Sequence, residues 1–137
     1  MKTKSFGFNL LELMITLSII GLLCALCLPV YSDHFVRARR MEAEIQLIKL
    51  AGALEKYYLL NNTYENATLD QLHISEIIAD HQYQLQIVST GREDFLIQAI
   101  PLDRQAEKDK TCASLSLDNT GNKGISGSGP LTECWQS

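Results

Sequence analysis

The chain has 137 residues and a formal net charge of −4 at pH 7, with 12 lysine and arginine residues against 16 aspartate and glutamate residues. This acidic balance does not favour binding to phosphate backbones, and we predict no direct nucleic-acid binding. No segment repeats, and the part of the chain that follows the apolar N-terminal run has about a hundred residues, enough for one domain with a modest core.

An apolar run dominates the N-terminal region. Its only charged side chain over residues 10–30 is Glu12, and Lys2 and Lys4 precede it. A helix needs about 20 apolar residues to cross a hydrocarbon core roughly 30 Å thick. Because positive charge before a first span keeps that end in the cytoplasm, we expect everything after Tyr31 to be exported.

Glu12 needs an explanation within this run. An ionised, unpaired carboxylate at membrane depth costs on the order of 2–3 kcal/mol, and the local sequence encodes no partner for it. An ordinary secretory signal has a shorter apolar core with a small-x-small cleavage site after it. Here Leu26 precedes Cys27, which also weakens the lipoprotein alternative, and the small residue Gly7 lies before the run.

The motif Gly7-Phe8-x-x-x-Glu12, at the start of an apolar helix, resembles the class III signal of type IV pilins and their pseudopilin relatives. The resemblance implies that residues 1–7 are a leader, which a prepilin peptidase cuts after Gly7, and that the new first residue, Phe8, is N-methylated. It also implies that Glu12 pairs with the N-terminal amine of a neighbouring subunit during assembly. Asn9 departs from the common threonine at a variable position. Glycine suits the scissile position because it lets an extended backbone approach closely.

Gly21 and Pro29 match the family's helix-weakening glycine and kinking proline. Proline lacks an amide hydrogen and clashes with the carbonyl four residues earlier, so we expect the helix to bend or open at Pro29 and to be weak at Gly21. Membrane helices also tolerate both residues without such a role, and the residues alone leave both interpretations open. We assign residues 8–31 to the transmembrane and filament-core half of the helix.

The helical pattern continues from Tyr31 to about Leu60, and it carries two apolar stripes on opposite sides. Two stripes imply two partners, so we assign one face to the chain's own globular head and the other to neighbouring subunits. A helix enclosed within a single small domain is the alternative. One stripe consists of Ala43, Leu47, Leu50, Leu54 and Tyr57, and the other of Met41, Ile45, Ile48 and Gly52.

Three arginines, Arg37, Arg39 and Arg40, follow the apolar run, with Glu42 and Glu44 beside them. A run of charges is usually a solvated face, and here it also suits lipid headgroup contacts where the chain leaves the membrane.

The second half of the chain changes period. Residues 61–72 predict a loop with a short helix beginning near Asp70. Segments of strand length follow at residues 83–89, 94–102 and 112–119, with turn signals between them, and predict an antiparallel meander. Glycines and a proline over residues 121–130 predict a mobile loop. The expected fold class is α+β: a long N-terminal helix packed on a small antiparallel sheet, with residues 32–137 as the head, as in the type IV pilin fold.

The four cysteines separate into two kinds. Cys24 and Cys27 lie on one face of the apolar helix, where they are most simply small buried hydrophobes. Cys112 and Cys134 lie in the exported half, in an oxidising compartment, and we infer that they form a disulfide. A zinc site is the alternative, but no C-x-x-C or paired histidine supports it. The bounded tail resembles the D-region of pilins, and of PilE-like minor pilins in particular.

No motif for catalysis, a cofactor or a metal is present in the sequence, and we expect none of these. His34, His73 and His81 are scattered, and the Asp118 turn does not have the spacing of an EF-hand.

The resemblance implies a structural subunit, a minor pilin, of a type IV pilus that supports adhesion, twitching motility or DNA uptake. An adhesin at the pilus tip and a pseudopilin of a type II secretion system are the alternatives. The implied partners are other pilin subunits, the prepilin peptidase and N-methyltransferase, and the assembly machinery. The chain would first lie in the bacterial inner membrane as a single-pass precursor and then in the fibre at the cell surface.

Overall fold

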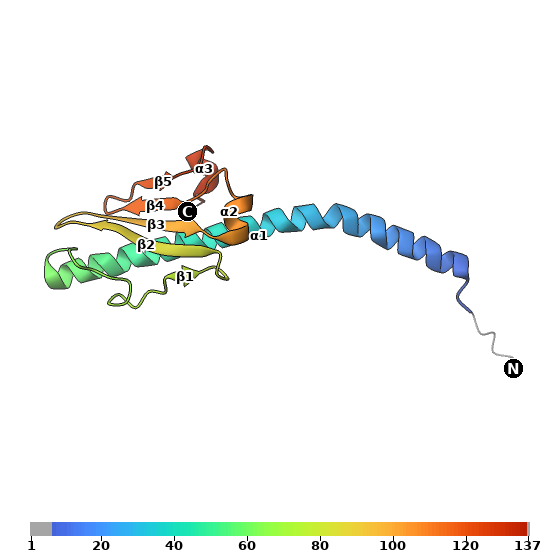
Figure 1. The fold of residues 1–137 in the computed structure, drawn as a ribbon, viewed down its shortest axis with the longest axis horizontal. Coiled ribbons are helices and arrows are strands. Elements are labelled where there is room, and N and C mark those ends of the chain that lie inside the picture. The colour runs from blue at the N-terminus through green and yellow to red at the C-terminus, as the bar shows by residue number, and fades with distance from the viewer. Residues whose placement is uncertain (1–6, 137) are drawn as a thin grey trace. The chain divides into compact units, whose positions relative to one another are not determined.

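The structure is a computed structural model that describes residues 7–136, so the leader segment before Gly7 lies outside the described residues. The described residues divide into two compact units, with the boundary between Phe35 and Val36. Figure 1 labels the elements, which are α1 (Leu10–Asn61), β1 (Ile77–Ile78), β2 (Tyr83–Thr90), β3 (Phe95–Pro101), α2 (Asp103–Lys108), β4 (Leu115–Asp118), β5 (Lys123–Ile125) and α3 (Leu131–Cys134).

The first unit contains the apolar part of α1. This helix is long and apolar enough to cross a membrane, and none of its most apolar window is buried within the chain. Leu17, Leu22 and Leu28, for example, are each more than 60% exposed. Because so many large apolar side chains are exposed within the described part of the chain, this segment requires a lipid or protein environment.

The second unit is built on an antiparallel meander. Its five strands follow one another in the order β1-β2-β3-β4-β5, and each strand pairs with the next (Figure 1). The pairing of Gln84 with Ile100 and of Ile97 with Leu117 fixes the register of the three central strands. A β-bulge interrupts β2 between Ile87 and Ser89. The predicted α+β fold class and its meander are confirmed.

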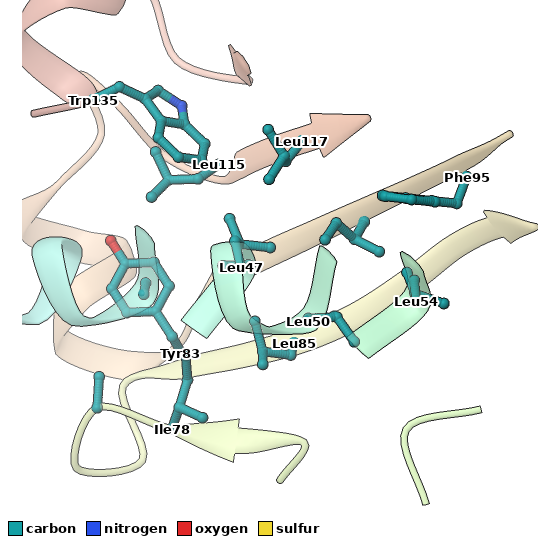
Figure 2. Packing of buried hydrophobic residues seen from close by; sticks show 14 of the residues in the cluster. Leu47, Leu50, Leu54, Ile78, Tyr83, Leu85, Phe95, Leu115, Leu117 and Trp135 are labelled. Atoms are coloured by element: carbon teal, nitrogen blue, oxygen red, sulfur yellow. The ribbon is translucent and has the colours of Figure 1, made fainter. Parts of the chain in front are cut away.

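The core of this unit lies between the sheet and the second half of α1. Leu47, Leu50 and Leu54 are fully buried and belong to one cluster with Leu85 and Leu115 from the strands (Figure 2). The helix contributes residues at a spacing of three and four, whereas β2 and β3 contribute alternate residues. The buried face of the helix, with its period of about 3.6 residues, and the buried faces of the strands, with their period of two, therefore pack together in one core.

Two local predictions were wrong. No helix begins near Asp70, because His73 has a φ of 54° and the Ile74 amide donates to the Leu69 carbonyl, which closes a turn instead. The glycine-rich segment is not a loop throughout, because residues 123–125 form β5 and pair with β4. A Cβ on Gly124 would crowd the hydroxyl of Ser116, its pairing partner on β4.

Candidate functional site

The residues of the signal motif lie at and just before the start of α1. Phe8 is 80% exposed, and the Asn9 carbonyl accepts the amide of Leu13 at 3.2 Å in the first turn. Glu12 lies in that turn, is exposed, and forms no ion pair with any residue of the described range 7–136. The cleavage of Gly7, the methylation of Phe8 and the pairing of Glu12 stay predictions.

Gly21 and Pro29 both lie inside α1, which continues through them as one helix. A Cβ at Gly21 would meet nothing within 4 Å, so packing inside the chain does not require glycine there. Two further helix residues, Cys24 and Cys27, are free thiols and are exposed in the isolated chain. The role of Gly21 and Pro29 in helix flexibility stays a prediction.

The two stripes of α1 have different surroundings in the second unit. The first stripe packs on the chain's own sheet, since Ala43, Leu47, Leu50 and Leu54 are all 0% exposed. The second stripe remains open: Met41, Ile45 and Ile48 are between 45% and 49% exposed. One of the two expected partners is thus the chain's own head, and the second stripe is a candidate assembly surface.

A disulfide joins Cys112 and Cys134, with their Cα atoms 5.5 Å apart, which confirms the bond predicted from the sequence. The bounded loop contains β4, β5 and α3. Gly127 donates its amide to the Cys112 carbonyl, and a Cβ on Gly127 would collide with the Thr111 carbonyl. Glycine is therefore needed where this loop folds back on itself.

Arg40 connects α1 to this region. Its guanidinium donates from Nε and Nη2 to the two carboxylate oxygens of Asp109, at 2.8 and 2.6 Å, and contacts the Glu133 carbonyl at 3.4 Å. Tyr83 and Gln105 donate to the same carboxylate. Desolvation lowers the pKa of Arg40, but the hydrogen bond and charge of Asp109 outweigh it and raise that pKa above its ordinary value.

The burial of Arg40 corrects the expectation of a solvated arginine face. Arg40 is only 8% exposed, because it lies four and seven residues before Glu44 and Leu47 on the buried side of the helix. Glu44 is 1% exposed and accepts the Gln136 amide with both carboxylate oxygens. The helical spacing was the available signal, but the acid that Arg40 binds lies 69 residues away.

The turn after β4 is organised by Asp118. Its carboxylate accepts the amides of Thr120 and Asn122 and the Thr120 hydroxyl. The Thr120 hydroxyl is the largest of the hydrogen-bond donors that lower the pKa of Asp118 to about 2. These protein donors occupy the carboxylate, and no three metal-binding side chains gather within the described part of the chain. Asp118 therefore organises a turn.

The sequence of this chain is similar to those of known proteins. Residues 29–116 match the family model described as "Type IV minor pilin ComP, DNA uptake sequence receptor". A major pilin of Neisseria gonorrhoeae, PilE1, is 41% identical over 69 residues, which are 50% of this chain and 42% of that protein. The fimbrial protein EcpC of Eikenella corrodens is 29% identical over 126 residues, covering 90% of this chain and 80% of that protein.

The chain spans less than half the length of the Neisseria relatives it matches. Among solved structures, the minor pilin PilV of Neisseria meningitidis has a TM-score of 0.55 at 22% identity and covers 69% of this chain and 89% of its own. A type IV pilin of Shewanella oneidensis has a TM-score of 0.52 at 27% identity, covering 74% and 99%. The family match spans more than half of the chain and includes the second half of α1 and strands β1 to β3, and this chain therefore belongs to the type IV minor pilin family.

Proposed function

We propose that this chain is a minor subunit of a type IV pilus. The proposal rests on two observations made together: the N-terminal half of α1 exposes its apolar side chains, and the head has a buried core of its own. The large apolar residues of α1 between Leu10 and Val30 are about half or more exposed, whereas the head has its own buried core. A helix of this kind is stored in the inner membrane and then packed at the centre of a fibre, where head-to-tail contacts that do not close generate a filament.

The proposed precursor has its head exported and its leader, residues 1–7, in the cytoplasm, because Lys2 and Lys4 precede the span. The prepilin peptidase and methyltransferase would act at Gly7 and Phe8. Glu12 would pair with the amine of a neighbouring subunit, which offsets the cost of an ionised carboxylate in an apolar setting. The role is structural, and no enzymatic activity is proposed.

Glu12 provides the main test. The Glu12→Val variant should be processed and held in the membrane but should be lost from sheared fibres. Thr16→Val is the matched control, since it removes a polar group one turn later. The Thr16 hydroxyl donates to the backbone carbonyls of Glu12 and Leu13 within the helix. Normal incorporation of Glu12→Val would refute the assembly role.

Gly7 tests processing separately. Gly7→Val should leave unprocessed precursor that still begins at Met1, as measured by N-terminal sequencing and intact mass. Gly52→Val is the control, because a Cβ at this exposed helix position also meets nothing. Normal maturation of Gly7→Val would remove the assignment of the cleavage site.

The alternatives differ in abundance and partners. An adhesin at the tip would be scarce in sheared fibres and would lose receptor binding without losing fibres when its disulfide-bounded loop is altered. A pseudopilin would associate with a secretion apparatus, and it is less favoured because the relatives described above are pilins and fimbrial proteins.

A second candidate function is DNA reception during uptake, which the description of the matched family favours. The net charge of −4 opposes it, because DNA affinity depends on neutralising phosphates. Fluorescence anisotropy of the full chain in detergent, with duplex DNA over a range of salt concentrations, distinguishes the two. Saturable, sequence-dependent binding at physiological salt would support reception, and its absence would leave the structural role alone.

A further inference from the structure

The outer edge of the sheet is only partly covered. β1 is two residues long and pairs only with Tyr83 and Gln84, whereas β2 has eight residues. Figure 1 shows the short β1 beside the much longer β2. The Leu85 amide donates to the Glu76 carbonyl at 2.7 Å, and there the pairing on this side ends. The rest of β2, residues 86–90, is an edge without a neighbouring strand.

The register shows which backbone groups point outward. The Leu102 amide donates to the Gln82 carbonyl, and the Leu85 amide donates toward β1 instead of β3. Because hydrogen-bonded and non-hydrogen-bonded pairs alternate, the pairs Leu85 with Ala99 and Ile87 with Ile97 are not hydrogen-bonded between β2 and β3. The amide and carbonyl of Ile87 therefore face away from β3. Within the described residues, no backbone hydrogen bond joins Ile87 to another segment on that side.

This edge forms one wall of a groove of about 460 Å³. The opposite wall is the turn over residues 67–70. Leu69 and Ile87 contribute apolar side chains to a lining that is otherwise mostly polar, and Asp70 and Glu76 are its charged residues. No lysine or arginine lines it among the described residues. The groove thus combines unpaired backbone groups, apolar contacts and negative charge.

We propose that this groove binds an extended peptide segment of another protein, carrying a lysine or arginine, which adds as a strand to the edge of β2. Backbone pairing with Ile87 would supply affinity, and alternate side chains would contact the apolar side chains of Leu69 and Ile87. Asp70 and Glu76, which form the acidic rim of the groove, favour a segment with a basic side chain. This rim disfavours two copies of this chain pairing through the same edge, because two acidic rims would then meet, and it disfavours nucleic acid.

The test uses the full chain in detergent micelles and a synthetic peptide, acetyl-Thr-Val-Lys-Val-Thr-Val-amide. Saturation with this peptide should slow hydrogen exchange of the Ile87 amide and shift resonances of residues 67–70 and 86–90. A peptide with glutamate in place of lysine should bind about five-fold more weakly, the scale of one exposed ion pair. N-methylation of one alternate set of peptide amides should abolish binding, and methylation of the other set should not.

Asp70→Lys tests the charge on the protein side. The Asp70 side chain is exposed in the turn, so the variant should fold normally and should weaken the lysine peptide about five- to ten-fold. Glu107→Lys makes the same change of charge at an exposed position of α2 outside the groove, and it should leave binding within about two-fold. Binding without protection of Ile87, equal loss in both variants, or self-association through the β2 edge would overturn the proposal.

Discussion

Arg40 and Asp109 are 69 residues apart in the sequence and are joined by two parallel hydrogen bonds between guanidinium and carboxylate. The pair is almost fully buried, with side-chain exposures of 10% and 2%. It joins the segment that leads into the disulfide to α1, the helix that carries the candidate assembly surface. A buried pair of this kind adds little net stability compared with apolar residues, but breaking it leaves a charge without a partner.

Asp109→Ala should therefore lower the free energy of unfolding by about 3–5 kcal/mol, because Arg40 would remain buried and unpaired. Urea unfolding of the full chain in detergent, followed by tryptophan fluorescence of Trp135, measures it. Asp103→Ala, at an exposed position of α2, is the control and should cost much less. The double variant Arg40→Met/Asp109→Leu should recover much of the loss, and a single-variant loss below about 1 kcal/mol would contradict the assigned role.

Removal of the disulfide by Cys112→Ser/Cys134→Ser should destabilise the head by about 3 kcal/mol, since the bond closes a loop with a sequence separation of 22. Reduction of the unaltered chain should have the same effect. The variant Cys24→Ser/Cys27→Ser should not change the response to reductant, because both residues are free thiols. Equal stability of the reduced and oxidised chain would refute this expectation.

The two stripes of α1 predict opposite phenotypes for neighbouring residues. Leu47→Ala should cost about 2–5 kcal/mol because it opens a cavity in the core, where Leu47 is 0% exposed. Ile48→Ala, at a position that is 46% exposed, should change stability by less than about 1 kcal/mol. Its expected effect is lower incorporation into sheared fibres, measured by immunoblotting. A fully stable Leu47→Ala head, or fibres that contain Ile48→Ala at the normal level, would count against this division.

Tyr64 gives a pH-dependent prediction. Desolvation and its hydrogen bond to Glu55 raise the pKa of this phenol to about 12, and burial also raises the pKa of Tyr83. Because the folded pKa lies above the unfolded value near 10, stability should fall as pH rises from about 10 through about 12.

Spectrophotometric titration of the tyrosines checks this prediction. The folded chain should show a late ionisation step that Tyr64→Phe reduces. A single step at the ordinary tyrosine pKa in the folded protein would show that Tyr64 and Tyr83 are not shielded from solvent.

Much of the fold could be read from local patterns. The apolar run, the two stripes of α1 and the alternation in β2 and β3 each arise from a period of 3.6 or 2 residues, and such periods are visible within a short window. The signal motif around Gly7 and Glu12 is also local. The sequence alone therefore determined the long helix, the meander and the family resemblance.

Only the tertiary structure decided which charges are buried and where the sheet is open. Arg40 looks like one of three solvated arginines until Asp109 and the Glu133 carbonyl are brought to it from far along the chain. β1 pairs only with Tyr83 and Gln84, which leaves the edge of β2 exposed at Ile87, and residues 62–76 before β1 contain no helix or strand. These features depend on contacts between residues that are far apart in the sequence, and a pattern within a short window does not predict such contacts.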